Sequence, residues 1–195
     1  MSKYFLIILV LSNLVFSQGV KSSSFWGDAG AGLNYIKLAN SDVMLNFRFG
    51  LNYKVNSNNF SVVYLNSSEF ELIDSPAEYL KSVSVIYGRS FDFTMRRLLV
   101  PLPLPMIVTK EFKYSLVVKI GASYIVKRER TGIIQLKPFN NLYSGEVKEG
   151  MGLPLEIELR EELTKSFGMS VSLYGNKNGI KDHWGFNFGI YIGQL

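Results

Sequence analysis

The sequence has no cysteine, a single histidine and few charged residues. The lack of cysteine excludes a disulfide scaffold, a Cys-ligated zinc or iron–sulfur site and a cysteine nucleophile. A lone histidine excludes a metal site built from several histidines of one chain. Charged residues make up 19% of the 195 residues and hydrophobic residues 47%, which excludes a disordered chain and suits one domain.

The formal net charge is +5, and the basic residues are spread along the chain. Nucleic-acid binding normally requires a concentrated basic patch, so we expect no nucleic-acid partner. No glycine-rich phosphate loop and no cluster of metal-ligating residues occurs in the sequence. We therefore expect no cofactor-binding, metal or catalytic residues.

The N-terminus carries an apolar run that follows a basic residue. Lys3 precedes the apolar stretch 4–10, and Val15 and Ser17 occupy the −3 and −1 positions of a cut before Gln18. This pattern is typical of a cleaved secretory signal peptide. A transmembrane anchor is the alternative, but the run is shorter than the roughly 20 apolar residues that a spanning helix needs. The predicted organisation is a signal peptide over residues 1–17 and one mature domain over residues 18–195.

The mature chain alternates between apolar and polar residues. In residues 43–55 every odd position is apolar, while Asn46, Arg48, Asn52 and Lys54 occupy even positions. Period two places the two sets on opposite faces of a strand, and thirteen residues suffice to cross a bilayer at a tilt. The same pattern predicts eight strands, over residues 25–36, 43–55, 60–66, 81–93, 112–127, 153–161, 166–174 and 184–192.

The second face of these strands holds small and polar residues with few charges. That composition suits a narrow lumen, with the apolar face turned toward lipid. The sequence therefore predicts an all-β fold, a transmembrane antiparallel up-and-down β-barrel of eight strands. An additional hairpin at residues 131–137 would raise the count to ten, and this alternative stays open.

The mature chain resembles the small eight-stranded outer-membrane β-barrels of Gram-negative bacteria. Its final segment, HWGFNFGIYIGQL, is similar to the C-terminal strand that such proteins use for assembly. Serine followed by glutamine at the signal cut resembles Bacteroidetes-type signals. The resemblance implies insertion in the outer membrane, contact with its lipid and lipopolysaccharide, and recognition by the barrel-assembly machinery.

Charged residues on the second face predict a polar network inside the lumen. Unpaired charges in a narrow interior are costly, so we expect them to pair. Similar barrels hold internal salt bridges that close the pore, and simple filling of the interior by side chains is the alternative. The predicted network consists of Arg48, Asp92, Lys113, Lys119, Glu156, Glu158 and Arg160.

Two regions are candidates for contact with a protein partner. Residues 94–111 form a long, apolar inner connection that contains Pro101, Pro103 and Pro105, which exclude a regular ladder at those positions. The simpler interpretation of this segment is two strands extended beyond the membrane. The outer loops, predicted at 37–42, 67–80, 128–151 and 175–183, are the second candidate region, and the basic start of the third, 127–130, is a candidate for lipopolysaccharide phosphates.

Three functions follow from these patterns. The first is a non-enzymatic outer-membrane barrel with a structural, adhesion or interaction role and a side-chain-filled lumen. The second is a secreted lipocalin-like barrel that binds a lipophilic ligand. The third is a barrel enzyme acting on outer-membrane lipid. His183 is its only candidate histidine base, with the adjacent Asp182 as the orienting group, but no serine nucleophile follows two residues after His183.

Overall fold

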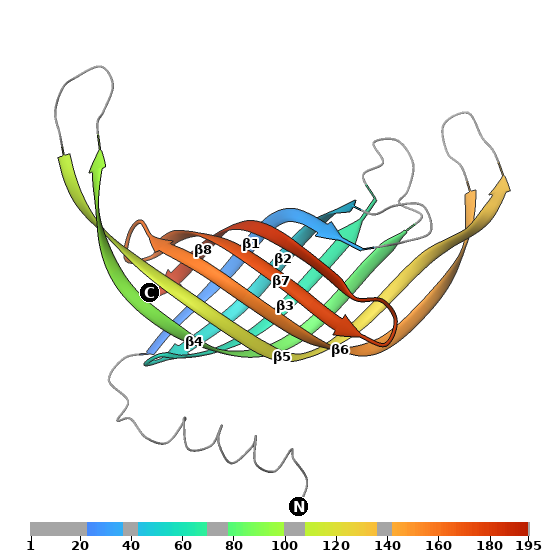
Figure 1. Cartoon of the computed structure of the whole chain (residues 1–195), viewed down its shortest axis with the longest axis horizontal. Coiled ribbons are helices and arrows are strands. Elements are labelled where there is room, and N and C mark those ends of the chain that lie inside the picture. Colours follow the sequence, from blue (N-terminus) through green and yellow to red (C-terminus); the bar gives the residue numbers. More distant parts are fainter. Residues whose placement is uncertain (1–22, 37–42, 70–77, 100–107, 136–141, 195) are drawn as a thin grey trace, which may run out of the picture.

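The computed structural model describes residues 23–36, 43–69, 78–99, 108–135 and 142–194, and its strands close into one barrel (Figure 1). Neighbouring strands are antiparallel and follow one another in chain order, and β1 pairs with β8. The strands are β1 (Ser23–Tyr35), β2 (Val43–Val55), β3 (Asn58–Ser68), β4 (Tyr79–Leu99), β5 (Val108–Gln135), β6 (Leu142–Glu162), β7 (Phe167–Asn178) and β8 (His183–Gln194). The predicted eight-stranded up-and-down barrel is confirmed. The predicted signal peptide lies outside the described residues.

Side chains alternate between the two sides of the wall, as the sequence pattern predicts. On β2, Leu51 is 58% exposed on the outside, whereas its neighbour Asn52 is fully buried inside. β-Branched and aromatic residues favour the extended backbone of such strands. The outside of the barrel is an apolar belt, which includes Phe47, Phe49, Leu51, Val62, Val85, Leu155, Leu173, Phe188 and Ile192. Within the described ranges, no helix has the length and apolar character needed to cross a bilayer.

Three strands are much longer than the others. β4, β5 and β6 have 21, 28 and 21 residues, whereas the remaining strands have 11 to 13. At about 3.3 Å per residue, β5 alone is roughly 90 Å long. Both ends of the barrel therefore carry projecting hairpins, which curve to the same side in Figure 1.

We call the end with Ser23 and Gln194 the inner end, and the opposite end the outer end. The inner ribbon comprises residues 90–99 of β4 and 108–112 of β5. The first residue of β3, Asn58, lies opposite Arg89, so β3 does not pair with β4 beyond it, and β6 pairs with β5 only from Lys113 onward. The outer ribbon comprises residues 129–135 of β5 and 142–151 of β6. On β5 it starts after Arg128, where the pairing with β4 ends, and on β6 it ends before Gly152, where the pairing with β7 starts.

The long hairpins decide two open questions. Residues 131–135 continue β5 and pair with β6 from Leu142 onward, so the ten-stranded alternative is wrong and the barrel is taller at its outer end. At the inner end, β4 pairs with β5 as far as Leu99 and Val108. Most of the segment 94–111 thus forms two extended strands. The three prolines fall in 100–107, outside the described residues.

Two aromatic side chains at the inner end of β5 are buried, unlike the other residues of the apolar belt. Phe112 and Tyr114 are 8% and 4% exposed, although they continue the outward face of β5. The ring of Tyr114 stacks on Phe93 at 5.6 Å, and its hydroxyl donates a hydrogen bond to Glu161 Oε1 at 3.1 Å. Side chains of β4 and β6 therefore contact Tyr114 at the inner end.

Candidate functional site

Six charged side chains meet inside the barrel. We call Asp28, Arg48, Lys119, Glu156, Glu158 and Arg160 the charged cluster; each is at most 6% exposed. Three carboxylates face three cations, so the cluster carries no net charge. Burial of charge is tolerated only where partners are close and hydrogen-bonded, and these contacts therefore decide whether the interior is stable.

Arg48 joins the first two strands to the opposite wall. Its guanidinium donates to the Asp28 carboxylate through Nη1 and to Glu156 Oε1 through Nη2, at 3.1 Å in the second case. Asn52 donates to the other oxygen of Asp28, and Ser61 donates to Asn52 Oδ1 at 2.7 Å. Each carboxylate oxygen of Asp28 thus accepts a hydrogen bond.

Lys119 continues the chain of contacts on the far side of the lumen. Its ammonium lies 3.3 Å from Glu156 Oε1 and 2.6 Å from Glu158 Oε2. The same Glu158 oxygen accepts a hydrogen bond from Arg160 Nη2 at 2.7 Å, and the Arg160 guanidinium lies 4.5 Å from the centre of the Trp26 ring. The charged cluster therefore spans the lumen from β1 and β2 to β5 and β6.

Gly50 provides the space that Asp28 occupies. The two residues are directly opposed in the pairing of β1 with β2. A Cβ atom on residue 50 would lie 2.3 Å from Asp28 Oδ2 and 2.8 Å from its Cγ. A side chain at this position would displace the Asp28 carboxylate, so glycine is required by the close approach.

The structure brings together five of the seven residues that the sequence analysis assigned to the lumen: Arg48, Lys119, Glu156, Glu158 and Arg160. Asp92 and Lys113 lie apart from them. Asp92 is 55% exposed in its side chain and binds Lys54 Nζ at 2.7 Å, and Lys113 is 76% exposed, 3.8 Å from Glu162. Both belong to the inner end, where β4 and β5 leave the closed part of the wall.

Asp28 was missed by the sequence analysis. It lies between glycine and alanine residues of β1, on the face opposite Phe25 and Ala29, and it is the only charged residue of that strand. The sequence did contain a signal. An acidic residue at an inward position of a glycine-rich strand is buried, and a buried carboxylate is stable when a cation faces it. Arg48, on the neighbouring predicted strand, is that cation.

The outer half of the lumen is filled differently. Ile36, Met44, Leu65, Leu80 and Ile125 point inward there and pack together, and we call them the apolar cluster. Each is at most 6% exposed, and Tyr174 and Ile180 pack against them. Inward positions of β1 to β5 therefore include a hydrophobic core that is separate from the outer belt.

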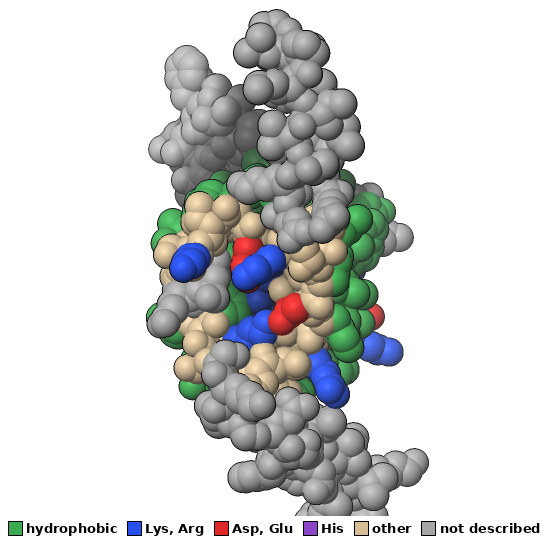
Figure 2. Space-filling view, turned by 90° about the vertical axis from the view of Figure 1, so that its left-hand side faces the viewer, with side chains coloured by type: hydrophobic (Ala, Val, Ile, Leu, Met, Phe, Trp, Pro, Cys, Tyr) green, Lys and Arg blue, Asp and Glu red, His purple; other side chains and the backbone are tan. Residues whose placement is uncertain are grey.

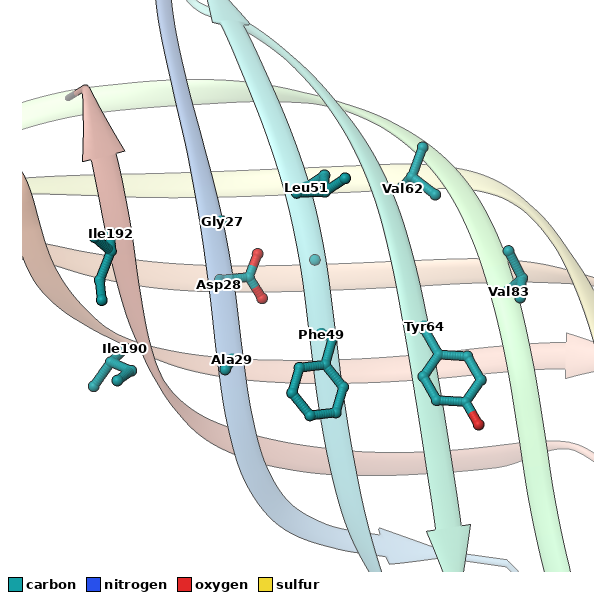
Figure 3. Close-up of a pocket in the computed structure, with 11 residues that line it drawn as sticks. Gly27, Asp28, Ala29, Phe49, Leu51, Val62, Tyr64, Val83, Ile190 and Ile192 are labelled. Carbon is teal, nitrogen blue, oxygen red and sulfur yellow. The ribbon is translucent and has the colours of Figure 1, made fainter.

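One cavity lies inside the barrel beside the charged cluster. It has a volume of about 30 Å³, which is too small for a lipophilic ligand, and its lining combines polar side chains such as Ser84 and Asn187 with apolar ones such as Val63 and Ile86. The larger hollow in Figure 3, of about 560 Å³, is a groove on the outer surface beside Gly27 and Ala29. Figure 2 shows charged and polar side chains at the inner mouth, surrounded by hydrophobic ones.

His183 is buried inside the wall at 3% exposure, and its ring meets Tyr174 edge-on at 6.4 Å. In the described part of the chain, no hydrogen bond joins His183 to a serine hydroxyl, and Asp182 accepts a hydrogen bond from the backbone amide of Asn178 at 2.9 Å. The described residues also contain no group of three histidine or acidic side chains placed to hold a metal ion. His183 thus has the surroundings of an interior packing residue.

Comparison with known proteins gives a fold and no family. No protein-family model matches the sequence, and no curated protein is similar to it in sequence. Among solved structures, neisserial surface protein A aligns with a TM-score of 0.53 and 14% identity over 88% of this chain and 99% of that one.

Two further structures agree with this result. The attachment invasion locus protein Ail of Yersinia pestis aligns with a TM-score of 0.54 and 13% identity, over 89% of this chain and 99% of Ail. The N-terminal β-barrel domain of Pseudomonas aeruginosa OprF gives 0.51 and 10%, over 87% and 96%. At such identities the likeness establishes the fold, which is that of small outer-membrane β-barrels.

Proposed function

We propose that this protein is exported by a cleaved signal peptide, inserts in the outer membrane as a barrel, and acts through its outer ribbon as an interaction or adhesion protein. The observation that carries the proposal is the combination of an apolar belt with a long projecting ribbon. A water-soluble protein rarely exposes contiguous apolar surface of this extent. Lipid hydrocarbon is the solvent that suits such a belt.

The hairpins support an orientation with both termini in the periplasm. Small outer-membrane barrels have short periplasmic turns and longer extracellular loops. At the inner end, Val55 and Asn58 are joined by a two-residue turn in which Asn56 has a φ of 54°. The outer ribbon then projects from the cell surface, where a partner outside the cell can reach it.

The outer ribbon offers an unpaired strand edge. In the described chain, no strand pairs with the side of β6 that faces away from β5 between residues 142 and 151. Val147 and Met151 on this stretch are 51% and 66% exposed. An open edge with exposed apolar side chains is the kind of surface to which an extended polypeptide adds as a further strand.

Charges on the outer ribbon are largely neutralised in pairs. Lys127, just before the outer ribbon, is buried, and its ammonium lies 3.1 Å from Glu129 Oε2. Desolvation of the Glu129 carboxyl alone would raise its pKa, but the hydrogen bond and the charge of Lys127 outweigh this effect, and the pKa is lowered. Arg130 lies 3.0 Å from Glu69, and Lys148 lies 3.1 Å from Glu146. This pairing favours an extended polypeptide over a polyanion as the main partner of the ribbon.

A polyanion is nevertheless the appropriate competing ligand to test. Ail of Yersinia pestis has been solved in complex with the heparin analogue sucrose octasulfate, and that structure aligns with a TM-score of 0.55 and 14% identity over 89% of this chain and 99% of Ail. Contact of the basic run 127–130 with lipopolysaccharide phosphates remains part of the proposal, although Lys127 and Arg130 already have carboxylate partners. The terminal strand β8 supports recognition by the barrel-assembly machinery.

A second interaction site is proposed at the inner ribbon. From Phe91 to Leu99, the edge of β4 that faces away from β5 has no strand partner in the described chain. Phe91, Phe93 and Met95 are 53%, 41% and 51% exposed along it. A periplasmic protein segment in extended conformation suits this edge for the same reasons.

Location is tested by fractionation with and without boiling. We expect the protein in the outer-membrane fraction, with different gel migration before and after heating. Recovery from the soluble periplasm would contradict the proposed membrane insertion.

Interaction is tested by trimming each ribbon. In the outer trim, residues 130–145 are replaced with Asn-Gly, which joins the directly paired Glu129 and Glu146. Val147 and Met151 stay on the open edge of β6, so the same variant carries Val147→Lys and Met151→Lys, because lysine on an edge strand opposes strand addition. In the inner trim, residues 95–112 are replaced with Asn-Gly, which joins the directly paired Thr94 and Lys113. Intact cells are then tested on immobilised unfolded α-lactalbumin and on immobilised heparin. We expect the outer trim alone to lose binding to the unfolded polypeptide. Loss of heparin binding only, or equal behaviour of both trims, would contradict the proposed strand-edge contact.

A further inference from the structure

The small interior cavity lies between the two clusters that fill the lumen. It has a volume of about 30 Å³. Arg48 and Glu156 of the charged cluster line it, as do Leu65 of the apolar cluster and Tyr174, which packs against that cluster. Residues of both clusters thus line the cavity, together with polar side chains such as Asn176, His183 and Asn187.

Three side chains on the cavity wall have unused hydrogen-bonding capacity: Asn187, Asn176 and His183, whose two ring nitrogens have no partner among the described residues. Asn187 is 2% exposed, and among the described residues neither its Oδ1 nor its Nδ2 has a partner. Asn176 is 5% exposed and donates through Nδ2 to Ser123 Oγ at 2.8 Å, while its Oδ1 has no partner within the same ranges. Buried amides without partners are unfavourable, so a guest that can both donate and accept hydrogen bonds is expected between them.

The size and charge of the cavity select the guest. A buried water occupies about 10–15 Å³ of a cavity measured in this way, so the cavity has room for about two or three water molecules and for no organic ligand. Arg48 and Glu156, which both line the cavity, already form an ion pair with each other at 3.1 Å. An ion would therefore meet no uncompensated charge, and a neutral guest is favoured.

We propose that this cavity is a binding site for water, held by Asn187, Asn176 and the ring of His183, between two closures of the lumen. The charged cluster closes the inner side and the apolar cluster closes the outer side. The two closures act in series and share no residue. An ion path through the barrel consequently requires both to be opened, and loss of either one alone leaves the lumen closed.

The water site is tested by crystallography and by NMR of water–amide contacts. In the unaltered protein we expect ordered water within hydrogen-bonding distance of both Asn187 side-chain atoms. Asn187→Leu is expected to lose this water, because leucine has a similar size and no polar atom. Asn34→Leu is the matched control: Asn34 is also buried and bonds to Ser67 Oγ at 2.9 Å, but it does not line the cavity, so the water should stay. A dry cavity in the unaltered protein would overturn the proposal.

The two closures are tested by ion conductance in planar bilayers. Arg48→Ala opens the charged side, Met44→Ala with Leu80→Ala opens the apolar side, and the triple variant opens both. We expect conductance from the triple variant only, with folding of each variant checked by heat-dependent gel migration. Conductance of the unaltered protein or of either one-sided variant would overturn the serial closure. If the triple variant does not fold, the water measurement still decides the proposal, and neither test depends on the function of the ribbons.

Discussion

The inner and outer halves of the lumen are filled by different chemistries. The inner half and the middle hold six buried charges in continuous contact, whereas the outer half holds a cluster of five aliphatic and thioether side chains beside separate buried polar residues such as Glu78 and Lys127. The same eight strands supply both, so the difference comes only from the inward residues. The stability of the charged cluster depends on every partner, because removal of one charged side chain leaves another charge buried without its partner. An apolar closure depends on filled volume, and its losses are more graded.

The largest effect is expected from Glu158→Ala. Glu158 Oε2 is shared by Lys119 and Arg160, at 2.6 Å and 2.7 Å, so its removal leaves two buried cations with fewer partners. We expect a loss of about 3–5 kcal/mol in the free energy of unfolding, measured by urea titration of the barrel in lipid vesicles. Glu162→Ala on the same strand is the control, since that carboxylate is partly exposed beside Lys113. Equal losses for the two variants would show that the charged cluster has no special role.

A smaller effect is expected in the apolar half. Leu80 is 1% exposed within the apolar cluster, and Leu80→Ala leaves a cavity there. We expect a loss of about 2–4 kcal/mol in the same titration. Leu155→Ala serves as control, because Leu155 is 51% exposed on the outer belt, where lipid fills the space that the substitution leaves. A Leu80→Ala loss no larger than that of Leu155→Ala would contradict the packing role of the apolar cluster.

An intermediate case lies at the edge of the charged cluster. Gly50→Ala adds a Cβ against the Asp28 carboxylate and displaces it from Arg48. Overpacking of this kind costs about 1–3 kcal/mol, to be read from the same unfolding curves. Gly27→Ala is the matched control on β1, since its added Cβ would meet only the Gly50 carbonyl oxygen, at 3.8 Å. No difference between the two alanine variants would contradict the assigned role of Gly50.

The smallest effect is expected from Lys113→Ala. Lys113 is largely exposed and its carboxylate partner is 3.8 Å away, so solvent screens the pair. We expect a change below about 0.5 kcal/mol, and a weaker one still at high salt. Lys119→Ala, six residues along the same strand, should approach the loss of Glu158→Ala. A large effect at Lys113 would place that residue inside the network after all.

The alternation of the sequence predicted the strands and the closed barrel well, because period two is a local property. It also named five of the six members of the charged cluster, since charges on a small-residue face are conspicuous. Asp28 was not predicted, because it is the only charged residue among the small residues of β1. The apolar cluster escaped for a different reason: Met44 and Ile125 occupy inward positions, and alternation alone does not show that such residues meet across a barrel. Strand tilt and register decide that meeting, and neither is a local property.

The position of the apolar belt in lipid is the central claim, and the lack of cysteine makes it directly measurable with single spin labels. Val85→Cys places a label on the belt, where Val85 is 64% exposed, and Val147→Cys places one on the outer ribbon. In lipid vesicles, we predict that the label at residue 85 collides with dissolved oxygen and is protected from an aqueous nickel chelate, with the reverse at residue 147. Equal access of the nickel chelate to both labels would contradict the account.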